Sequence, residues 1–580
     1  MDKKIESTYK QWMAEPDMPA NLMRELEAMA GHDDQIEDAF GATLSFGTAG
    51  MRGIIGAGLN RMNIYTVRQA AEGLAMLMDQ LDPATKQRGV AISFDPRYGS
   101  REFAYNAAQV LGAHGIKSFI VDDIRPVPEL SFAVRHLHTY AGIMITASHN
   151  PKQYNGFKIY GEDGGQMPPK ESAIITESAH QANDLFAIKI ADISKLREAK
   201  LLRVVGEDID LAYLAEAKKV NIDKDLIDRV GKDLKFVYSP LHGAGKIIGR
   251  RALSTAGFKN FEMVTEQTIA DPEFPTTPHP NPEYREAFDL AIKQGKQVGA
   301  DILIETDPDA DRLGAAVRQP DGEYKLMTGN QIASVMLNYI LQAKQAKGVL
   351  PENGIIVKSI VSTELATKIA EHYGVDTKNV LTGFKYIAEQ IKQFEESGQH
   401  SFQFGFEESY GYLIRPFVRD KDAIQSTMML AEVAAYYKDR GMTLYDGLQE
   451  MYTQYGYFEE ETISKLFEGL DGKQKMAAIM DSLRNDPMTE FAGEHVDFIE
   501  DFQTAVRTYD DGKTEAIDMP TSNVLKYWLA DGSWITIRPS GTEPKVKFYV
   551  GVNDQSEAKA KGRLDRYVSA IHKLIEELTK

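Results

Sequence analysis

Short apolar runs rich in β-branched residues recur along the chain, and each is closed by a polar turn or by glycine and proline. The clearest of these runs are residues 89–95, 116–122, 141–146, 234–239, 300–306 and 354–360. Segments with helical spacing lie between them, including residues 65–81 and 425–438. Alternation of this kind is typical of α/β domains whose parallel strands are buried on both faces. The pattern therefore predicts largely parallel sheets, whose ligands bind at the carboxyl ends of the strands.

The pattern also divides the chain. A charged region at about 170–220 is expected to be helical and to separate two sets of strands. The proline-rich stretch 271–283 is expected to be an ordered loop, because apolar patterns flank it closely. A charged segment at 457–485 precedes a region of different character, in which two hairpin-like stretches are followed by an amphipathic helix from 555. Its length of 580 residues is too great for one core and suggests about three or four domains.

The composition of the chain argues against several classes of function. The formal net charge of −19 opposes binding of nucleic acid over a large surface, so any phosphate should meet a local cluster of Arg and Lys. The chain has no cysteine, which removes thiolate nucleophiles, disulfides and Cys-bound zinc. No stretch reaches 18 apolar residues, and the N-terminal segment lacks the apolar core of a signal peptide. We expect a soluble cytoplasmic protein that binds neither nucleic acid nor membrane.

The strongest chemical motif is the sequence ETDPDADRLG at 305–314, directly after an apolar run. Asp307, Asp309 and Asp311 alternate, so an extended backbone would point all three carboxylates the same way at steps of about 6–7 Å. Like charges placed together need a cation, and oxygen ligands alone select a hard ion such as Mg²⁺. An EF-hand does not fit, because the glycine and glutamate that its loop requires are absent. A solvated acidic turn is the competing interpretation.

A serine follows another buried run, in ITASHNPKQYNG at 145–156. Ser148 has Thr146 and Asn150 two residues to either side, where a hydrolase nucleophile elbow would have glycines. A serine near a Mg²⁺ site makes chemical sense as a phosphoryl carrier, and Lys158 lies ten residues further on. Taken alone, the Ser-His-Asn sequence is equally compatible with a turn or a helix cap.

Three further loops carry polar residues suited to a sugar phosphate. FGTAGMRG at 46–53 and IRPSGTEPKVKF at 537–548 each combine an arginine with small residues that expose the backbone, a pattern that suits phosphate. QFGFEESYGY at 403–412 offers paired carboxylates that suit sugar hydroxyls, although a solvated loop would have the same composition. LHGAGKIIG at 241–249 matches neither the dinucleotide fingerprint nor a Walker A loop.

Together these motifs resemble those of the α-D-phosphohexomutases. TASHNP, DPDADR, GFEES and RPSGTEP occur here in the order and at about the separations found in that family, and the resemblance runs from about residue 40 to the end. FGTAGMRG, GLNRMNIYTVRQAAEGL, DDIRPVPELSFAVR and FPTTPHPNPE are similar to the longer bacterial phosphoglucomutases and the related phosphopentomutases.

The resemblance implies a four-domain α/β enzyme, with three related mixed α/β domains and a smaller α+β domain like the TATA-binding protein. Each domain would contribute one loop to a central cleft. The expected boundaries are 1–204 for the phosphoserine loop, 205–318 for the metal loop, 319–455 for the sugar loop and 456–580 for the phosphate loop. We expect a monomer or weak dimer that acts on small sugar phosphates.

The resemblance also implies roles for individual residues. Ser148 would be the phosphoserine and would share one Mg²⁺ with Asp307, Asp309 and Asp311, while Lys158 would be the general acid or base. His149 and Arg52 would support the transferring phosphoryl group. The remaining contacts to substrate would come from Arg312, Thr382, Lys385, Glu407, Ser409, Lys421, Arg538, Ser540, Gly541, Thr542 and Lys547.

The implied reaction converts glucose 1-phosphate to glucose 6-phosphate, with glucose 1,6-bisphosphate as intermediate and activator. Mannose-tolerant bacterial relatives often carry a histidine two residues after the serine of the sugar loop, where this chain has Gly411. That difference favours glucose phosphates, and mannose and pentose phosphates remain open. Two alternatives of another class are a phosphatase that uses a phosphoserine and a sensor of sugar phosphates without catalysis.

Overall fold

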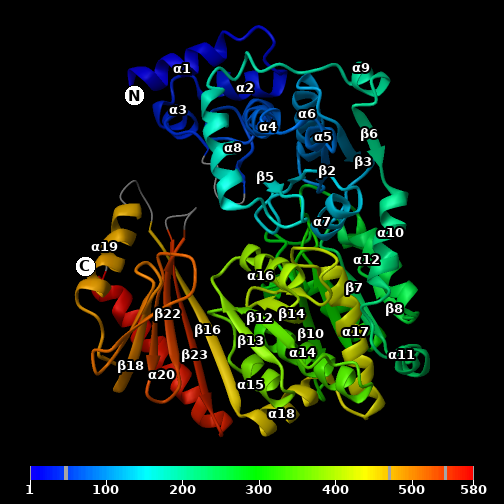
Figure 1. The fold of residues 1–580 in the computed structure, drawn as a ribbon, viewed down its shortest axis with the longest axis vertical. Helices are drawn as coiled ribbons and strands as arrows, with labels where there is room; N and C mark the ends of the chain where they lie inside the picture. Colours follow the sequence, from blue (N-terminus) through cyan, green and yellow to red (C-terminus); the bar gives the residue numbers. More distant parts are fainter. Residues whose placement is uncertain (1, 45–49, 468–471, 541–544, 579–580) are drawn as a thin grey trace. The chain divides into compact units, whose positions relative to one another are not determined.

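The structure is a computed structural model, and it describes residues 2–44, 50–467, 472–540 and 545–578 (Figure 1). The chain divides into two compact units, each described here by itself. The first unit comprises Met1–Ile332, Ala388–Ser397 and Ser409–Thr443. The second comprises Ala333–Ile387, Gly398–Glu408 and Leu444–Lys580.

The first sheet of unit one has the strand order β1-β5-β4-β2-β3-β6. Its four parallel strands are β2 (Val90–Phe94), β3 (Ser118–Val121), β4 (Ala141–Ile145) and β6 (Leu202–Val205). β5 (Tyr154–Tyr160) runs antiparallel to β4, and the edge strand β1 (Met51–Ile54) pairs antiparallel with β5. Every residue of β2, β3 and β4 is buried, as continuous apolar runs predict for a sheet covered on both faces.

Helices surround this sheet. They are α1 (Lys3–Met13), α2 (Ala20–Met29), α3 (Asp33–Phe40), α4 (Ile64–Asp79), α5 (Pro83–Gln87), α6 (Ser100–Ala113), α7 (Val127–His136), α8 (Pro169–Gln181) and α9 (Ile193–Glu198). The helix expected at 65–81 is α4, and a capping box at Asn63 fixes its start. The expectation that 170–220 is helical throughout was wrong, because β6 lies inside it. That strand was missed because its central residues, Arg203 and Val204, are exposed and its apolar run is short.

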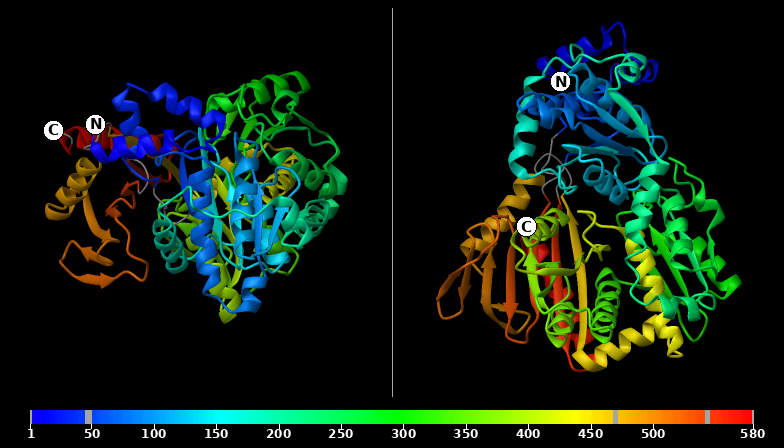
Figure 2. Two further views of the ribbon diagram at one scale, coloured as in Figure 1. Left: turned by 90° about the horizontal axis from the view of Figure 1, so that it is seen from above. Right: turned by 45° about the vertical axis from the view of Figure 1, so that its right-hand side comes forward.

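The second sheet of unit one has the order β11-β10-β9-β7-β8. Its strands are β7 (Phe236–Ser239), β8 (Phe261–Met263), β9 (Ile302–Thr306), β10 (Leu313–Arg318) and β11 (Tyr324–Met327), of which β7, β8 and β9 are parallel. Its helices are α10 (Glu207–Ala217), α11 (Lys224–Val230), α12 (Gly245–Ala256), α13 (Asp289–Val298) and the short η1 (Thr265–Thr268) and η2 (Arg285–Phe288). The helix expected at 425–438 is α17 (Ala423–Asp439), which packs against α11 and α12 (Figure 2). The stretch 271–283 is a loop, as expected.

The second unit contains the parallel strands β12 (Gly354–Ser359), β13 (Asp376–Val380) and β14 (Ser401–Glu407), with β12 in the centre. Helices of this region are α14 (Gly329–Ala346), α15 (Leu365–His372), α16 (Phe384–Ser397) and α18 (Leu444–Tyr455), and β15 (Gly411–Leu413) follows β14 in the chain. α14 and α16 each cross a boundary between the two units.

The C-terminal part of unit two is an antiparallel sheet of the order β16-β23-β22-β21-β18-β19-β20, with β17 paired to β18. Its strands are β16 (Tyr457–Leu466), β17 (Glu490–Phe491), β18 (Glu494–Asp501), β19 (Val506–Tyr509), β20 (Thr514–Ala516), β21 (Leu525–Leu529), β22 (Trp534–Pro539) and β23 (Lys545–Asp554). α19 (Gly472–Asn485) and α20 (Glu557–Leu578) cover it, and α20 runs along one face (Figure 1). The expected hairpins and closing helix are confirmed, and so is the fold class of mixed α/β domains with a sheet-rich C-terminal domain. Among the described residues, no helix is long and apolar enough to span a membrane.

A buried lysine joins the two sheets of unit two. Lys526 on β21 is 2% exposed, and its Nζ donates to the Ile360 carbonyl oxygen at 2.6 Å. The rings of Trp528 and Trp534 lie 4.2 and 4.5 Å from the same nitrogen and replace part of its lost hydration. Burial still dominates and lowers the pKa of Lys526 from 10.5 to about 8, against the attraction of Glu364.

From the lowered pKa of Lys526 we predict how the free energy of unfolding changes with pH. Because the pKa of Lys526 is lower in the folded state, the unfolded chain binds more protons between about pH 8 and 10.5. This residue therefore makes the free energy of unfolding rise with pH across that window, by about 3 kcal/mol in total. Lys526→Met should flatten the rise, which urea unfolding of both proteins at pH 7.5, 8.5 and 9.5 would measure. An equal slope in the two proteins would contradict the assignment.

Candidate functional site

Ser148 lies where the buried strand β4 ends. Its backbone is left-handed, with φ 52°, a conformation that costs a non-glycine residue about 1–2 kcal/mol. The Thr146 hydroxyl accepts the Ser148 N–H at 2.8 Å and holds this turn from within. As a result the Ser148 hydroxyl donates to Asp307 Oδ2 at 2.7 Å, across 159 residues of sequence.

One guanidinium group holds the loop that carries Ser148. Arg97 is buried, and one of its nitrogens donates to the Ser148 carbonyl at 2.6 Å while the other donates to the Pro151 and Tyr154 carbonyls at 2.9 and 3.1 Å. Asp95 pairs with the Arg97 Nε at 3.2 Å. A fork of fixed geometry that binds several carbonyls at once is well suited to hold a strained turn. Arg97 is therefore a positioning residue for Ser148.

The three aspartates follow β9, at the carboxyl end of the second sheet. Each is buried, and one carboxylate oxygen from each lies within 4.8 Å of the others. Oδ1 of Asp309 and Oδ1 of Asp311 accept no hydrogen bond from the described residues. Buried carboxylate oxygens without a donor are costly, and a hard cation would satisfy both. The donor set is therefore one that Mg²⁺ favours.

Two ammonium groups partly balance these carboxylates. Lys158 on β5 lies 3.1 Å from Asp309 Oδ2 and 3.8 Å from Asp311 Oδ2. Lys421 lies 3.0 Å from the same Asp311 oxygen. β5 pairs antiparallel with β4, the strand that precedes Ser148. Lys158 therefore comes from the strand next to the one that leads to the serine.

The pKa values of the three aspartates shift in different directions. Burial and the neighbouring Asp309 raise the pKa of Asp307 well above its usual range, and the same causes raise the pKa of Asp311. For Asp309 burial also opposes ionisation, but the Lys158 ammonium outweighs it and the pKa of Asp309 falls below its usual range. A divalent cation placed among them would favour the ionised form of all three carboxyl groups.

The other predicted residues of unit one lie around this centre. His149 Nδ1 is 3.2 Å from the Ser148 hydroxyl oxygen. Burial and the positive charges of Arg312 and Arg52 lower the pKa of His149 well below its usual range, so its ring is neutral. Arg52, on β1, donates to Asn150 Oδ1 at 2.7 Å. Arg312 donates to Glu283 Oε1 at 2.6 Å.

The structure explains why a glycine occupies position 411, which the sequence alone did not show. A Cβ at this position would lie 2.1 Å from Cδ of Lys421, a side chain that is buried and paired with Asp311. Glycine at position 411 therefore provides the space that the Lys421 side chain needs to reach Asp311.

This packing predicts the effect of Gly411→Ala. The new methyl group must displace Lys421 from Asp311. For the glucose 1-phosphate conversion that the resemblance implies, we therefore expect kcat/KM to fall about tenfold through a charge pair weakened by about 1.4 kcal/mol. Steady-state kinetics and thermal unfolding of the variant would measure this. Gly562→Ala on α20 is the matched control, because a Cβ there meets nothing within 4 Å. Equal activity of both variants would show that Lys421 is not needed where it lies.

The remaining predicted residues belong to unit two, except Ser409. Glu407 ends β14 and accepts the Gly383 N–H at 2.6 Å, between the predicted residues Thr382 and Lys385. Thr382 Oγ1 has no hydrogen-bond partner within the described part of the chain, and Lys385 Nζ lies 4.9 Å from the centre of the Tyr386 ring. Ser409, in unit one, is half-buried in the turn after β14.

The phosphate-loop residues lie on neighbouring strands of the C-terminal sheet. Arg538 on β22 pairs in register with Lys547 on β23, and the Ser540 N–H donates to the Lys545 carbonyl at 2.7 Å. Gly541 and Thr542 lie outside the described residues, as does part of the loop 46–53. The structure thus brings the predicted residues together in groups within each unit.

Sequence reasoning missed three contributors, Arg97, Asp95 and Thr146. Arg97 and Thr146 hydrogen-bond to backbone atoms of the Ser148 loop, and Asp95 pairs with Arg97. No pattern of residue types along a sequence identifies contacts of this kind. A signal was present, since SFDPRYGS at 93–100 places a charged pair directly after a buried strand. The glycines of LHGAGKIIG also have a role, because a Cβ on Gly243 would lie 2.3 Å from Cα of Pro308 in the aspartate loop. These glycines permit close packing of this segment against its neighbours.

Comparison with protein families gives four matches that follow one another along the chain. They are the phosphoglucomutase/phosphomannomutase alpha/beta/alpha domains I, II and III, at residues 43–185, 212–322 and 328–455, and the C-terminal domain of the same family at residues 475–561.

Individual proteins agree with these matches. A phosphoglucomutase of Staphylococcus haemolyticus is 39% identical over 520 residues, which cover 89% of this chain and 92% of the relative. A phosphoglucomutase of Staphylococcus epidermidis is 41% identical over 522 residues, with coverage of 90% and 92%. Among solved structures, the open form of the phosphoglucomutase parafusin from Paramecium superimposes with a TM-score of 0.66 at 18% identity, covering 93% of this chain and 95% of that one. That last likeness concerns the fold alone.

Proposed function

Since the chain belongs to the phosphoglucomutase/phosphomannomutase family, whose members are isomerases that transfer a phosphoryl group, we propose that it interconverts glucose 1-phosphate and glucose 6-phosphate through a phosphorylated Ser148. The observation that carries the proposal is the contact of the Ser148 hydroxyl with Asp307 at 2.7 Å, inside a cluster of three buried aspartates. A serine that merely caps a turn would have no reason to be held against a buried carboxyl.

In the proposed cycle, phospho-Ser148 gives its phosphoryl group to the free 6-hydroxyl of glucose 1-phosphate. The P–O bond to Ser148 breaks, a P–O bond to the sugar forms, and the bisphosphate then returns its other phosphoryl group to Ser148. Positioning and electrostatics carry most of the acceleration in such transfers. Lys158 is the group whose place beside Asp309 suits holding the proton that passes between the sugar hydroxyl and the Ser148 oxygen.

One Mg²⁺ would be held by Asp307, Asp309 and Asp311 together with an oxygen on Ser148. The two carboxylate oxygens without a donor, on Asp309 and Asp311, fit this ion. When bound, it would neutralise negative charge on the phosphoryl group. Arg52 on β1 and the neutral His149 beside Ser148 would orient that group.

For the rest of the substrate we propose two groups of contacts. Glu407 and Ser409 would bind sugar hydroxyls, with Thr382, Lys385 and Arg312 beside them. Arg538, Ser540, Gly541, Thr542 and Lys547 would bind the phosphate that does not react, together with Lys421. The domain limits 1–204, 205–318, 319–455 and 456–580 would assign one loop to each domain.

Glucose is proposed as the sugar because relatives at about 40% identity bear the name phosphoglucomutase and because Gly411 is packed against Lys421. The test is a mass measurement of the protein, with and without glucose 1,6-bisphosphate, while conversion of glucose, mannose and ribose 1-phosphates is followed. Phosphate on Ser148 with preferred formation of glucose 6-phosphate supports the proposal. Release of inorganic phosphate would assign a phosphatase, and binding without turnover would assign a sensor.

Metal removal should separate chemistry from binding. Dialysis against a chelator is expected to lower turnover at least about 10³-fold, because the aspartate charges then repel the phosphoryl group. Mg²⁺ should restore turnover, whereas Ca²⁺, which takes more ligands at longer distances, should restore it poorly. Full activity in chelator would contradict the metal site.

A further inference from the structure

A groove between two helices that cover the second sheet of unit one takes no part in the proposed reaction. It lies between α10 and α12 in unit one and has a volume of about 560 Å³, within the range of sites for small organic molecules. Residues spaced by three or four positions line it from each helix, so it extends for about two turns, roughly 10–12 Å.

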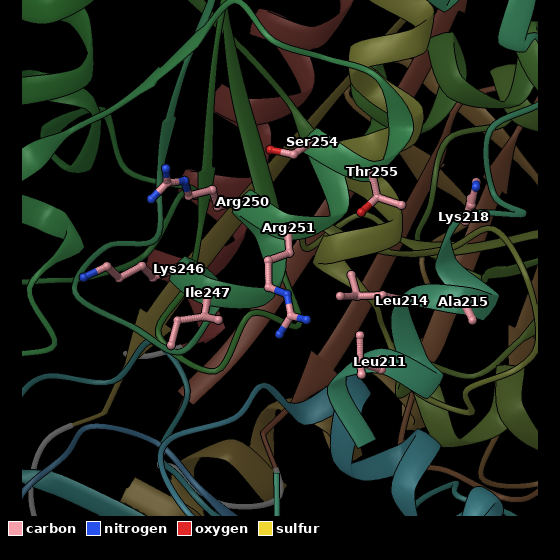
Figure 3. A pocket seen from close by; sticks show the side chains of 10 residues that line it. All are labelled: Leu211, Leu214, Ala215, Lys218, Lys246, Ile247, Arg250, Arg251, Ser254 and Thr255. Atoms are coloured by element: carbon pink, nitrogen blue, oxygen red, sulfur yellow. The ribbon is translucent and has the colours of Figure 1, made fainter. Parts of the chain in front are cut away.

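The floor of the groove is apolar and open to solvent. Leu211 on α10 is 55% exposed and Ile247 on α12 is 42% exposed, and Leu214 lies beside them. Figure 3 shows Leu211 and Leu214 on one side of the groove and Ile247 on the other. Exposed apolar side chains that lie together, rather than singly, are a feature of binding surfaces.

The rim is cationic. Lys218, Lys246 and Arg250 line the groove and have no ion-pair partner among the residues that the structure describes. A fourth cation, Arg251, lies between the two sides of the floor (Figure 3) and is already held by Glu207 at 2.8 Å and Asp210 at 3.3 Å. In a chain of net charge −19, three unpaired cations around one hollow are a local exception.

We propose that this groove binds an organic polyanion of the nucleoside polyphosphate class, with its base on Leu211 and Ile247 and its phosphates on Lys246, Arg250 and Lys218. A symmetric contact with a second copy is disfavoured, because it would set the cations of α12 against themselves. Nucleic acid is disfavoured by the negative charge of the rest of the protein.

Both walls of the groove reach the aspartate loop. The residue before α12, Ala244, donates its N–H to the Pro308 carbonyl at 2.8 Å. On the other side, Asp210 of α10 binds Arg125 at 2.7 Å, and two residues later the Val127 N–H donates to the Asp309 carbonyl at 2.9 Å. A ligand that spans α10 and α12 therefore acts on two elements that hold consecutive carbonyls of this loop.

A regulatory effect follows and rests on the proposed function. Any ligand that favours one relative placement of α10 and α12 shifts the loop toward the placement it binds best. We expect the polyanion to change kcat by about two- to fivefold, with a smaller change in KM. Binding itself does not depend on turnover, so a chain inactive as a mutase would leave the binding site testable.

The experiment is calorimetric titration of the full chain with adenosine triphosphate, tripolyphosphate and adenosine. Excess Mg²⁺ is kept constant, and saturating glucose 1,6-bisphosphate fills the sugar-phosphate site. Saturable binding of the triphosphate with a Kd below about 1 mM, at least threefold tighter than tripolyphosphate or adenosine, is the expected result. Equal binding of tripolyphosphate would overturn the role of the floor.

Matched variants assign the binding to the groove. Lys246→Glu with Arg250→Glu should weaken triphosphate binding at least tenfold, and Ile247→Ser should weaken the triphosphate but not tripolyphosphate. The control is Lys232→Glu with Lys293→Glu, which makes the same change of charge at exposed positions outside the groove. Retained binding in the first double variant overturns the proposal. So does binding of an acidic amphipathic helical peptide when no nucleotide binds, since the groove would then belong to a protein partner.

Discussion

Replacing Ser148 with alanine is expected to lower conversion of glucose 1-phosphate by at least about 10⁴-fold, because the variant lacks the oxygen that we propose as the carrier of the phosphoryl group. The fold should not change, since the Ser148 N–H bond to Thr146 and the carbonyl bond to Arg97 do not involve the lost hydroxyl. Intact mass should show no phosphate on the variant after incubation with glucose 1,6-bisphosphate. Coupled assay of glucose 6-phosphate gives the rate.

The control for this variant is substrate binding. Ser148→Ala should still bind glucose 1,6-bisphosphate within about threefold of the parent, because the proposed phosphate and sugar contacts remain. Loss of both binding and turnover would indicate that the loop had collapsed, and Ser148→Thr, which keeps a hydroxyl, would then test the chemistry. Turnover that persists in Ser148→Ala, with phosphate on another residue, would mean that Ser148 is not the carrier.

The parts of this site that could be predicted from the sequence are the local ones. Asp307, Asp309 and Asp311 could be identified because they alternate directly after a buried strand. The extended backbone expected for them was wrong, because residues 307–311 form a turn in which Ala310 is left-handed with φ 51°. The turn, and not a strand, brings one oxygen of each carboxylate within 4.8 Å of the others. The buried strands were visible because period and composition are properties of a few adjacent residues. The contact between Ser148 and Asp307 spans 159 residues and could be expected only through the resemblance to a family.

What could not be predicted are contacts made to the backbone or through shape. Arg97 bonds the carbonyls of a loop more than 50 residues away, and a carbonyl is present at every position of any sequence. Gly411 matters because Lys421 passes close to it, which no spacing of residues reveals. β6 was missed because Arg203 and Val204 face solvent at a sheet edge, where the apolar pattern that identifies a strand is weakest.

Arg97→Met is expected to lower kcat by about 10²–10³-fold while KM for glucose 1-phosphate changes less than about threefold. Methionine has nearly the volume of arginine and fills most of its place, but it cannot donate to the Ser148, Pro151 and Tyr154 carbonyls. The left-handed backbone at Ser148 would then relax, and displacement of a reacting group by about 1 Å costs about 10²-fold in rate. Steady-state kinetics and the rate of phosphoryl transfer to Ser148 measure the two effects.

A loss of stability alone would also reduce activity, so the test needs a readout that stability does not move. Arg97→Ala leaves a cavity beside Asp95 and the ring of Phe274, over which the guanidinium is stacked at 5.0 Å. Guanidinium ion at 10–50 mM should enter that space and raise the kcat of Arg97→Ala at least about fivefold, whereas it should leave Arg97→Met unchanged because the methionine occupies the space. Urea of equal concentration is the control for general solvent effects. Rescue of both variants, or of neither, would show that the guanidinium group does not set the position of Ser148.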